Sequence, residues 1–161
     1  MNTIVTVVNG SRARFFSLQP AETPVYESSP RLVEHENLVN PENESADKAL
    51  WSDNSSGNRS SAGGGAHGYD DHREQHRAEY ERRFSQSIAA KAIKLAHKQQ
   101  AKSIVVVADS HMLGLLRNGL ENSNGFSIKE LAKDYSKLSI SDLHAQLASH
   151  HLIPAQRKPG Q

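Results

Sequence analysis

The chain has 161 residues, with 19 basic and 18 acidic side chains, so its formal net charge of +1 gives no bulk preference for nucleic acid or another polyanion. One domain is expected at this length, and the absence of cysteine excludes disulfides, thiol nucleophiles and Cys-ligated zinc. The first residues lack the pattern of a signal peptide, and no apolar run approaches the roughly 18 residues of a membrane span. We therefore expect a cytoplasmic protein that makes no membrane contact.

The N-terminal segment predicts a β-hairpin. Thr3–Val8 is apolar and rich in β-branched residues, which is typical of a strand. Asn9 and Gly10 tolerate the positive φ that a two-residue type I′ turn requires, and a second strand is predicted over Arg12–Leu18. Its alternating residues point to opposite faces of the sheet. One face has Ala13, Phe15 and Ser17, and the other has Arg12, Arg14 and Phe16. The arginines are expected on a solvated face.

A long polar stretch follows the strands. The weak alternation of Arg31–Val39 predicts a third strand, at an edge of the sheet. Residues 40–69 are too many for an ordinary connection, so this loop is expected to be mobile or functional. Trp51 lies within it, and two interpretations remain open. Leu50 and Trp51 pack back on the body, or Trp51 stacks on a base or on a partner.

A helix is predicted over Asp70–Gln100, directly after the sequence Gly63-Gly64-Gly65-Ala66-His67-Gly68. From Tyr80 onward its apolar residues recur every three or four positions, so this part is expected to pack on the body. The part from Asp70 to Arg77 has almost no apolar face, and it is expected to project into solvent or to be stabilised on binding. A glycine-rich loop that leads into a long helix suggests that the helix holds the tip of the loop out for contact with a partner.

The continuous apolar run Ser103–Ala108 predicts a central strand that is buried on both faces. Asp109 or Ser110 is expected to cap a helix over His111–Leu120. Because α/β proteins often bind ligands where such strands end, Asp109 and Ser110 also form a candidate ligand crevice. Helix capping is the stronger explanation.

The C-terminal part predicts a strand over Phe126–Ala132 and then a last helix. Ser139 and Asp142 have the spacing of a capping box at the start of that helix. The whole order predicts an α/β fold with a mixed β-sheet, an N-terminal hairpin and flanking helices. Residues 1–153 are expected to form the domain, and residues 154–161 a flexible tail.

The hairpin sequence Val7-Val8-Asn9-Gly10-Ser11-Arg12-Ala13-Arg14-Phe15-Phe16 resembles the start of a bacterial family of proteins required for attachment to host cells. The likeness continues through Leu32–Pro41, His72–Phe84, Val105–Leu116 and Leu131–Leu138, so it covers nearly the whole chain. The order and spacing of these segments carry the match. The family name implies little about molecular mechanism.

That family is in turn similar to the central domain of eukaryotic and archaeal peptide-chain release factors, in which a Gly-Gly-Gln loop precedes a long helix. Gly63-Gly64-Gly65 occupies the comparable place, but Gly65 and Ala66 stand where the catalytic glutamine would be. The resemblance therefore implies the scaffold and argues against peptidyl-tRNA hydrolysis. Release-factor relatives without the glutamine serve in ribosome rescue or dormancy, so ribosome binding remains open.

Basic side chains give the main candidates for contact with RNA phosphates. Arg73 and Arg77 share a face of the projecting part of the helix, and three lysines line one side of its later part. Interleaved glutamates offer salt bridges, so a solvated face is the alternative. The candidate RNA- or ribosome-binding residues are Arg59, Gly63, Gly64, Gly65, His67, Arg73, Arg77, Lys91, Lys94 and Lys98.

Other chemistry has weaker support. His72 and His76 are one helical turn apart and could hold a metal with Asp71 or His67, but no glutamate follows His72 as the zincin pattern requires. Histidines in a charged helical stretch are usually solvated. No metal or cofactor is expected, and no nucleophile elbow or phosphate-binding loop is present.

Three functions follow. The first is a non-enzymatic protein that contacts the ribosome or structured RNA through the glycine-rich loop and the helix after it, in translation, stress or dormancy. The second is a protein–protein interaction module of the attachment family that docks through the loop of residues 40–69. The third is a hydrolase that uses His67 or Asp109.

Overall fold

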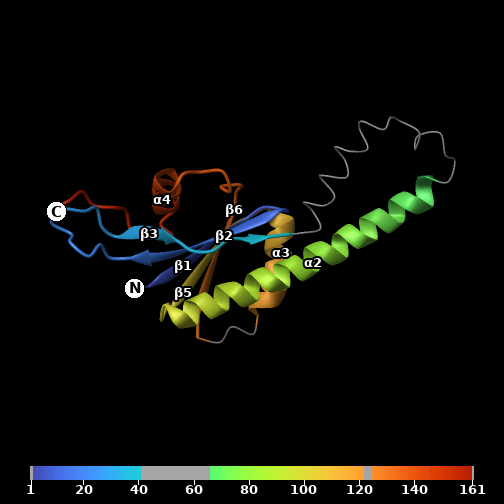
Figure 1. The fold of residues 1–161 in the computed structure, drawn as a ribbon, viewed down its shortest axis with the longest axis horizontal. Coiled ribbons are helices and arrows are strands. Elements are labelled where there is room, and N and C mark those ends of the chain that lie inside the picture. The colour runs from blue at the N-terminus through green and yellow to red at the C-terminus, as the bar shows by residue number, and fades with distance from the viewer. Residues whose placement is uncertain (1, 41–65, 122–124, 161) are drawn as a thin grey trace.

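The computed structural model describes residues 2–40, 66–121 and 125–160, and over residues 66–73 it describes the backbone alone. Within these ranges a six-stranded sheet lies between two layers of helix (Figure 1). Helices α2 (Ala66–Lys98) and α3 (Ser110–Leu120) cover one face, and α4 (Ile140–Ser149) covers the other. The predicted α/β fold with a mixed sheet is confirmed.

The sheet has the strand order β3-β2-β1-β5-β6, and β4 pairs with β2 beyond the end of β3. Central strand β1 pairs antiparallel with β2 and parallel with β5, and β5 pairs parallel with β6. The hairpin therefore supplies the antiparallel side of the sheet, as predicted. The strands are β1 (Thr3–Val8), β2 (Arg12–Gln19), β3 (Arg31–Glu34), β4 (Leu38–Val39), β5 (Ser103–Ala108) and β6 (Ser127–Ala132).

The hairpin turn differs from the prediction. Among the described residues, positive φ occurs at Gln100, Gly125, His151 and Gly160, so the type I′ turn expected at Asn9 and Gly10 is wrong. The Asn9 side chain replaces it: its Oδ1 accepts hydrogen bonds from the backbone N–H of Ser11 at 2.8 Å and of Arg12 at 2.7 Å. An asparagine side chain can thus close a turn without a left-handed backbone.

The third predicted strand is interrupted. The expected strand over Arg31–Val39 is two short strands, β3 and β4, that both pair with β2. Phe16 pairs with Glu34 and Ala13 pairs with Leu38, so three residues of one chain segment lie opposite two of the other. This extra residue is a bulge, and it breaks the regular ladder.

Two apolar clusters lie on opposite faces of the sheet. Alternate residues of β5 contribute to each: Ile104 and Val106 face α2 and α3, and Val105 and Val107 face α4. In β2, Phe15 belongs to the first cluster and Phe16 to the second. The predicted central strand, buried on both faces, and the predicted alternation of β2 are therefore confirmed.

Helix α2 begins four residues before the predicted start and ends two residues before the predicted end. Its start at Ala66 places Gly68 inside the helix, where a glycine costs only about 1 kcal/mol relative to alanine. At the other end Gln100 adopts a left-handed φ of 55°, and the N–H of Ala101 donates to the carbonyl of Ala96 at 2.8 Å. This is a Schellman motif without its usual glycine, so the sequence gives no signal for it.

The C-terminal elements follow the predicted boundaries closely. Ser139 caps α4 by accepting from the N–H of Asp142 at 3.1 Å. After α4, Leu152 packs against the core and His151 is exposed. In the tail, Arg157 and Ser29 exchange two backbone hydrogen bonds, at 3.1 and 2.9 Å. The flexibility of the tail and the domain bounds stay predictions.

Candidate functional site

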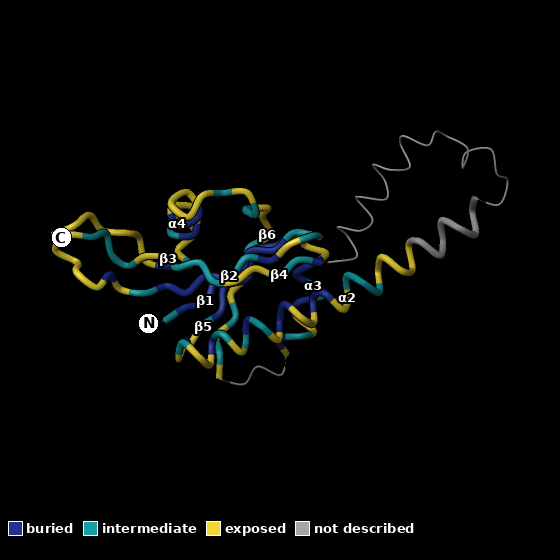
Figure 2. The backbone as a smooth tube through the Cα atoms, viewed as in Figure 1, coloured by how far each residue is buried: buried dark blue, intermediate teal, exposed yellow. Residues whose placement is uncertain are grey.

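Helix α2 passes from the sheet into solvent at the edge where the parallel strands end (Figure 1). Phe84, Ile88 and Ala92 are buried under the sheet, whereas every residue from Glu74 to Ala78 is exposed. Figure 2 shows this change along the helix, from buried positions over the sheet to exposed ones beyond it. The prediction of a packed later part and a projecting earlier part is confirmed for the residues whose side chains are described.

A crevice of about 280 Å³ lies where α2 leaves the body. One wall is β4 with the residue after it, and the other is one side of α2. Asn40, which is buried, fixes the first wall because its N–H donates to the carbonyl of Ser11 in the hairpin turn at 2.8 Å. The lining residues are Leu38, Val39, Asn40, Tyr80, Arg83, Phe84 and Ser87.

Two aromatic rings follow each other along the helix at the crevice. Phe84 is buried and belongs to the core beneath. Tyr80 is half-buried, and its ring stacks with that of His76, with centroids 6.0 Å apart and planes at 24°. A row of rings thus runs from the crevice onto the exposed part of α2.

The arginines of this helix differ in their partners. Glu79 binds both Arg82, at 2.6 Å, and Arg83, at 3.0 Å, so one carboxylate is shared between two guanidinium groups. The hydrogen bond from Arg82 is the main reason that the pKa of Glu79 lies below its usual value. Arg77 is exposed and makes no ion pair with any other part of the described chain. Among the arginines of α2 whose side chains are described, it is therefore the one most available to an anionic partner.

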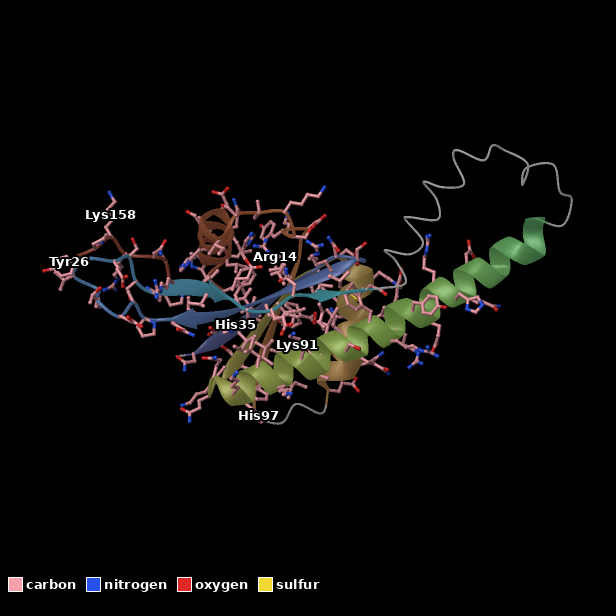
Figure 3. The ribbon with its side chains drawn as sticks, in the orientation of Figure 1. Arg14, Tyr26, His35, Lys91, His97 and Lys158 are labelled. Carbon is pink, nitrogen blue, oxygen red and sulfur yellow. The ribbon has the colours of Figure 1, made fainter. Side chains whose placement is uncertain are left out.

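The candidate lysines lie on the packed part of α2. Lys91 is half-buried: its Nζ is 3.9 Å from Glu36 and 5.6 Å from the centre of the Phe15 ring (Figure 3). Lys94 and Lys98 are exposed. The three lysines share a helix face, as predicted, but they follow the sheet and do not join Arg77 in the projecting part.

A polar network lies beside the C-terminal end of α2. His35 Nε2 is 2.7 Å from the Oγ of buried Ser17, which also accepts from Gln19 Nε2 at 2.8 Å. Burial, and then the charge of Lys98, lower the pKa of His35 from its usual 6.5. The Nε2 of a neutral His35 can accept a hydrogen bond from the Ser17 hydroxyl, which agrees with that direction.

Asp109 and Ser110 stand at the start of α3. The Asp109 side chain accepts from the N–H of Met112 at 2.8 Å, so the predicted helix cap is confirmed. One residue further along, His111 Nε2 is 2.9 Å from Glu81 of α2. This contact connects the end of the sheet to the helix just inside its projecting part. A ligand beside Asp109 stays a prediction.

The remaining candidates cannot be placed on the surface. Trp51, Arg59, Gly63, Gly64 and Gly65 lie outside the described residues, and so does most of the loop of residues 40–69. His67, His72 and Arg73 lie in α2, where only the backbone is described. Within the described side chains, no three His, Asp or Glu residues gather as a metal-binding set. None of the described helices is long and apolar enough to cross a bilayer.

Arg14 corrects another prediction. It was expected on a solvated face, but its guanidinium binds both carboxylate oxygens of Glu34, at 3.0 and 3.1 Å. It also donates to the carbonyls of Ser136, at 3.2 Å, and Leu138, at 2.8 Å (Figure 3). Arg14 is therefore a structural residue that ties β2 and β3 to the segment before α4.

The sequence did not reveal the crevice. Tyr80 was expected in the core with Phe84, because both occupy the apolar stripe of the helix. The stripe continues one turn past the sheet, and the position of β4 opposite it follows from the bulge after β3. The signal available in the sequence was the mixed stripe itself, in which Arg77 and Tyr80 precede Phe84 at helical spacing.

Comparison with known proteins gives one family. Residues 4–147 match the model of a family described as "protein required for attachment to host cells". No curated protein matches the chain. The match spans most of the chain and includes every strand and helix described above, except the first residue of β1 and the last residues of α4. The chain therefore belongs to the family of proteins required for attachment to host cells.

Proposed function

We propose that this protein is a non-enzymatic binding protein that contacts the ribosome or another structured RNA through the projecting end of α2. The observation that carries the proposal is the exposure of every side chain from Glu74 to Ala78, in a helix that continues outward to Ala66. Most helical stability in proteins comes from packing an apolar face. A helix that extends without such a face is suited to contact with a partner outside the body.

The charge and the rings near the end of the helix favour RNA. Arg77 has no ion pair within the described chain, and the His76 and Tyr80 rings lie beside it. Arginine and aromatic side chains together are the usual elements of binding to unpaired nucleic acid. The resemblance to release-factor central domains agrees with a ribosomal partner. Contacts from Gly63, Gly64 and Gly65 belong to the same proposal, as does a cytoplasmic location.

A protein partner is the second candidate. Glu79 offsets part of the charge of Arg82 and Arg83, and Glu81 pairs with His111, so the helix is not uniformly basic. The family description, attachment to host cells, names a process that involves contact between macromolecules. In this alternative the same projecting helix contacts a protein and binds no RNA.

Co-sedimentation with purified ribosomes tests the proposal. Binding should fall steeply between about 50 and 200 mM salt, because phosphate contacts release counterions. Arg77→Glu should reduce binding at a fixed salt concentration. Lys158→Glu makes the same charge change at the opposite end of the molecule and should leave binding unchanged (Figure 3). Equal loss in both variants, or no sedimentation with ribosomes at low salt, would contradict the proposal and favour a protein partner.

A further inference from the structure

We infer that the crevice between β4 and α2 receives one unpaired base of an RNA strand, stacked against Tyr80, with the adjoining phosphate facing Arg77. The inference rests on the proposed function and makes it more specific. It moves the recognition of RNA from the outer end of α2 to the place where the helix meets the sheet.

The size of the crevice suits one base. Pockets for drug-sized ligands span roughly 300 to 1,000 Å³. The crevice has about 280 Å³, so it fits a single planar group better than a larger cofactor. Leu38 and Phe84 give it an apolar floor, because both pack against the core cluster under α2.

The rings supply the stacking surface. Tyr80 lines the crevice, and the stacked His76 ring continues the row toward solvent. Bases stack on such rings with little dependence on sequence, because every base has a π-face. Since the row follows the helix, a second base of the strand can follow the first along α2.

The charges lie on the same side of the helix. Arg77, Tyr80, Phe84, Ser87 and Lys91 recur every three or four residues, so they share one face of α2. Arg77 is one turn outside the crevice, and Lys91 is one turn inside it. Among the nearby carboxylates, Glu36 pairs with Lys91, and Glu79 pairs with Arg82 and Arg83. A strand that lies along this face therefore meets Arg77 on the outer side of the crevice, and on the inner side Lys91, whose charge Glu36 partly offsets.

The polar groups of the lining residues favour a base over an apolar peptide side chain as the occupant of the crevice. The lining includes Tyr80 with its hydroxyl, Ser87, whose hydroxyl donates to the carbonyl of Arg83 at 3.1 Å, and Arg83, whose guanidinium pairs with Glu79. These groups offer donors and acceptors to the edge of a base. An apolar side chain would leave their hydrogen-bonding capacity unused at the contact.

The test is binding of the full chain to a short, fluorescently labelled single-stranded RNA of mixed sequence. Tyr80→Ala should weaken binding by about 5- to 100-fold, the range that the loss of one stacked base gives. Tyr80→Phe keeps the ring and should bind within about twofold of the parent chain. Tyr26→Ala is the matched control, because Tyr26 is 81% exposed at the opposite end of the molecule (Figure 3).

Arg77→Ala and Arg82→Ala form a second matched pair, with the same change in charge on different faces of α2. Arg77→Ala should reduce the slope of log affinity against log salt by about 0.7, the value for one phosphate contact with a single strand. Arg82→Ala should leave the slope unchanged. A duplex RNA of the same length should bind more weakly, because its bases are not available for stacking.

Three outcomes overturn the inference in distinguishable ways. If Tyr80→Ala and Tyr26→Ala bind RNA equally strongly, the crevice is not the binding site for a base, and the proposed function still stands. If the parent chain does not bind this RNA at low salt but sediments with ribosomes, the inference fails alone; if it binds neither, the proposed function fails as well. A short acidic peptide that contains an aromatic residue, if it binds more tightly than RNA and depends on Tyr80, assigns the crevice to a protein partner.

Discussion

The two parts of α2 are the same helix, held by different forces. Over the sheet, Phe84, Ile88, Ala92 and Ala96 are buried in the core cluster shared with α3. Beyond the sheet the described side chains face solvent, and their contacts are local, such as the ion pairs of Glu79. Exposed ion pairs of this kind contribute little to stability. The packed part is fixed by the fold, whereas the projecting part is free to serve a partner.

The largest difference should come from the core. Ile88 is 1% exposed, and Ile88→Ala should lower the free energy of unfolding by about 2 to 5 kcal/mol, because it leaves a cavity under the sheet. Glu74→Ala, in the projecting part, should change it by less than about 0.5 kcal/mol. Urea unfolding followed by circular dichroism measures both. Equal losses would show that the projecting part belongs to the same packed unit.

Arg14, in the sheet, and Arg77, in the projecting part of α2, extend this comparison to charged side chains. Arg14→Ala should cost about 2 to 3 kcal/mol in urea unfolding, because it leaves Glu34 and two carbonyls without their partner. Arg77→Ala should cost less than about 0.5 kcal/mol. Proton exchange at the Arg14 guanidinium, which these hydrogen bonds should slow in the parent chain, gives a second measurement. A stable Arg14→Ala variant would mean that its contacts are not needed for the fold.

Two glycines of α3 test the contact between the helices. A Cβ added at Gly119 would lie 2.6 Å from the Cβ of Ala89, whereas nothing lies within 4 Å of one added at Gly114. Gly119→Ala should therefore destabilise by about 1 to 3 kcal/mol. Gly114→Ala should stabilise by about 0.5 to 1 kcal/mol, through helix propensity. If the two variants change the melting temperature in the same direction, α3 does not pack on α2 as described.

The smallest expected effect is the pH dependence at His35, beside the end of the packed part. Burial, and then Lys98, lower its pKa below 6.5, so the folded state binds fewer protons than the unfolded chain. Stability should therefore be complete above that pH and should fall as the pH drops through 6.5 toward the folded-state pKa. His35→Gln should flatten this slope of stability against pH, measured by urea unfolding at several pH values. The same substitution at exposed His151 serves as the control. A slope that is unchanged in His35→Gln would refute the assignment.

The sequence predicts the elements whose signals are local. The apolar run at Ser103–Ala108, the Asp109 cap and the stripe of α2 all depend on residues close in the chain, and the structure confirms them. The errors share a different cause. The turn closed by the Asn9 side chain, the bulge after β3 and the Schellman end at Gln100 depend on geometry that several residue types can adopt.

The candidate site shows the same limit. The exposed part of α2 could be predicted, because its lack of an apolar face is a property of the helix alone. The crevice could not, because it depends on the register that brings Leu38 opposite Ala13 and so places Asn40 beside Tyr80. Arg14 was misjudged for the same reason, since its partners come from β3 and from the segment before α4. Contacts between distant segments decide which charges are free.

Hydrogen exchange of α2 with and without single-stranded RNA tests the central claim most directly. In the free protein, amides from Glu74 to Ala78 should exchange by local opening, and those from Ile88 to Ala96 only through global unfolding. The account predicts that RNA slows exchange over residues 76–87 and leaves α4 unchanged. RNA that binds without slowing exchange there, or that protects α4 in its place, would contradict the assignment of α2 as the contact element.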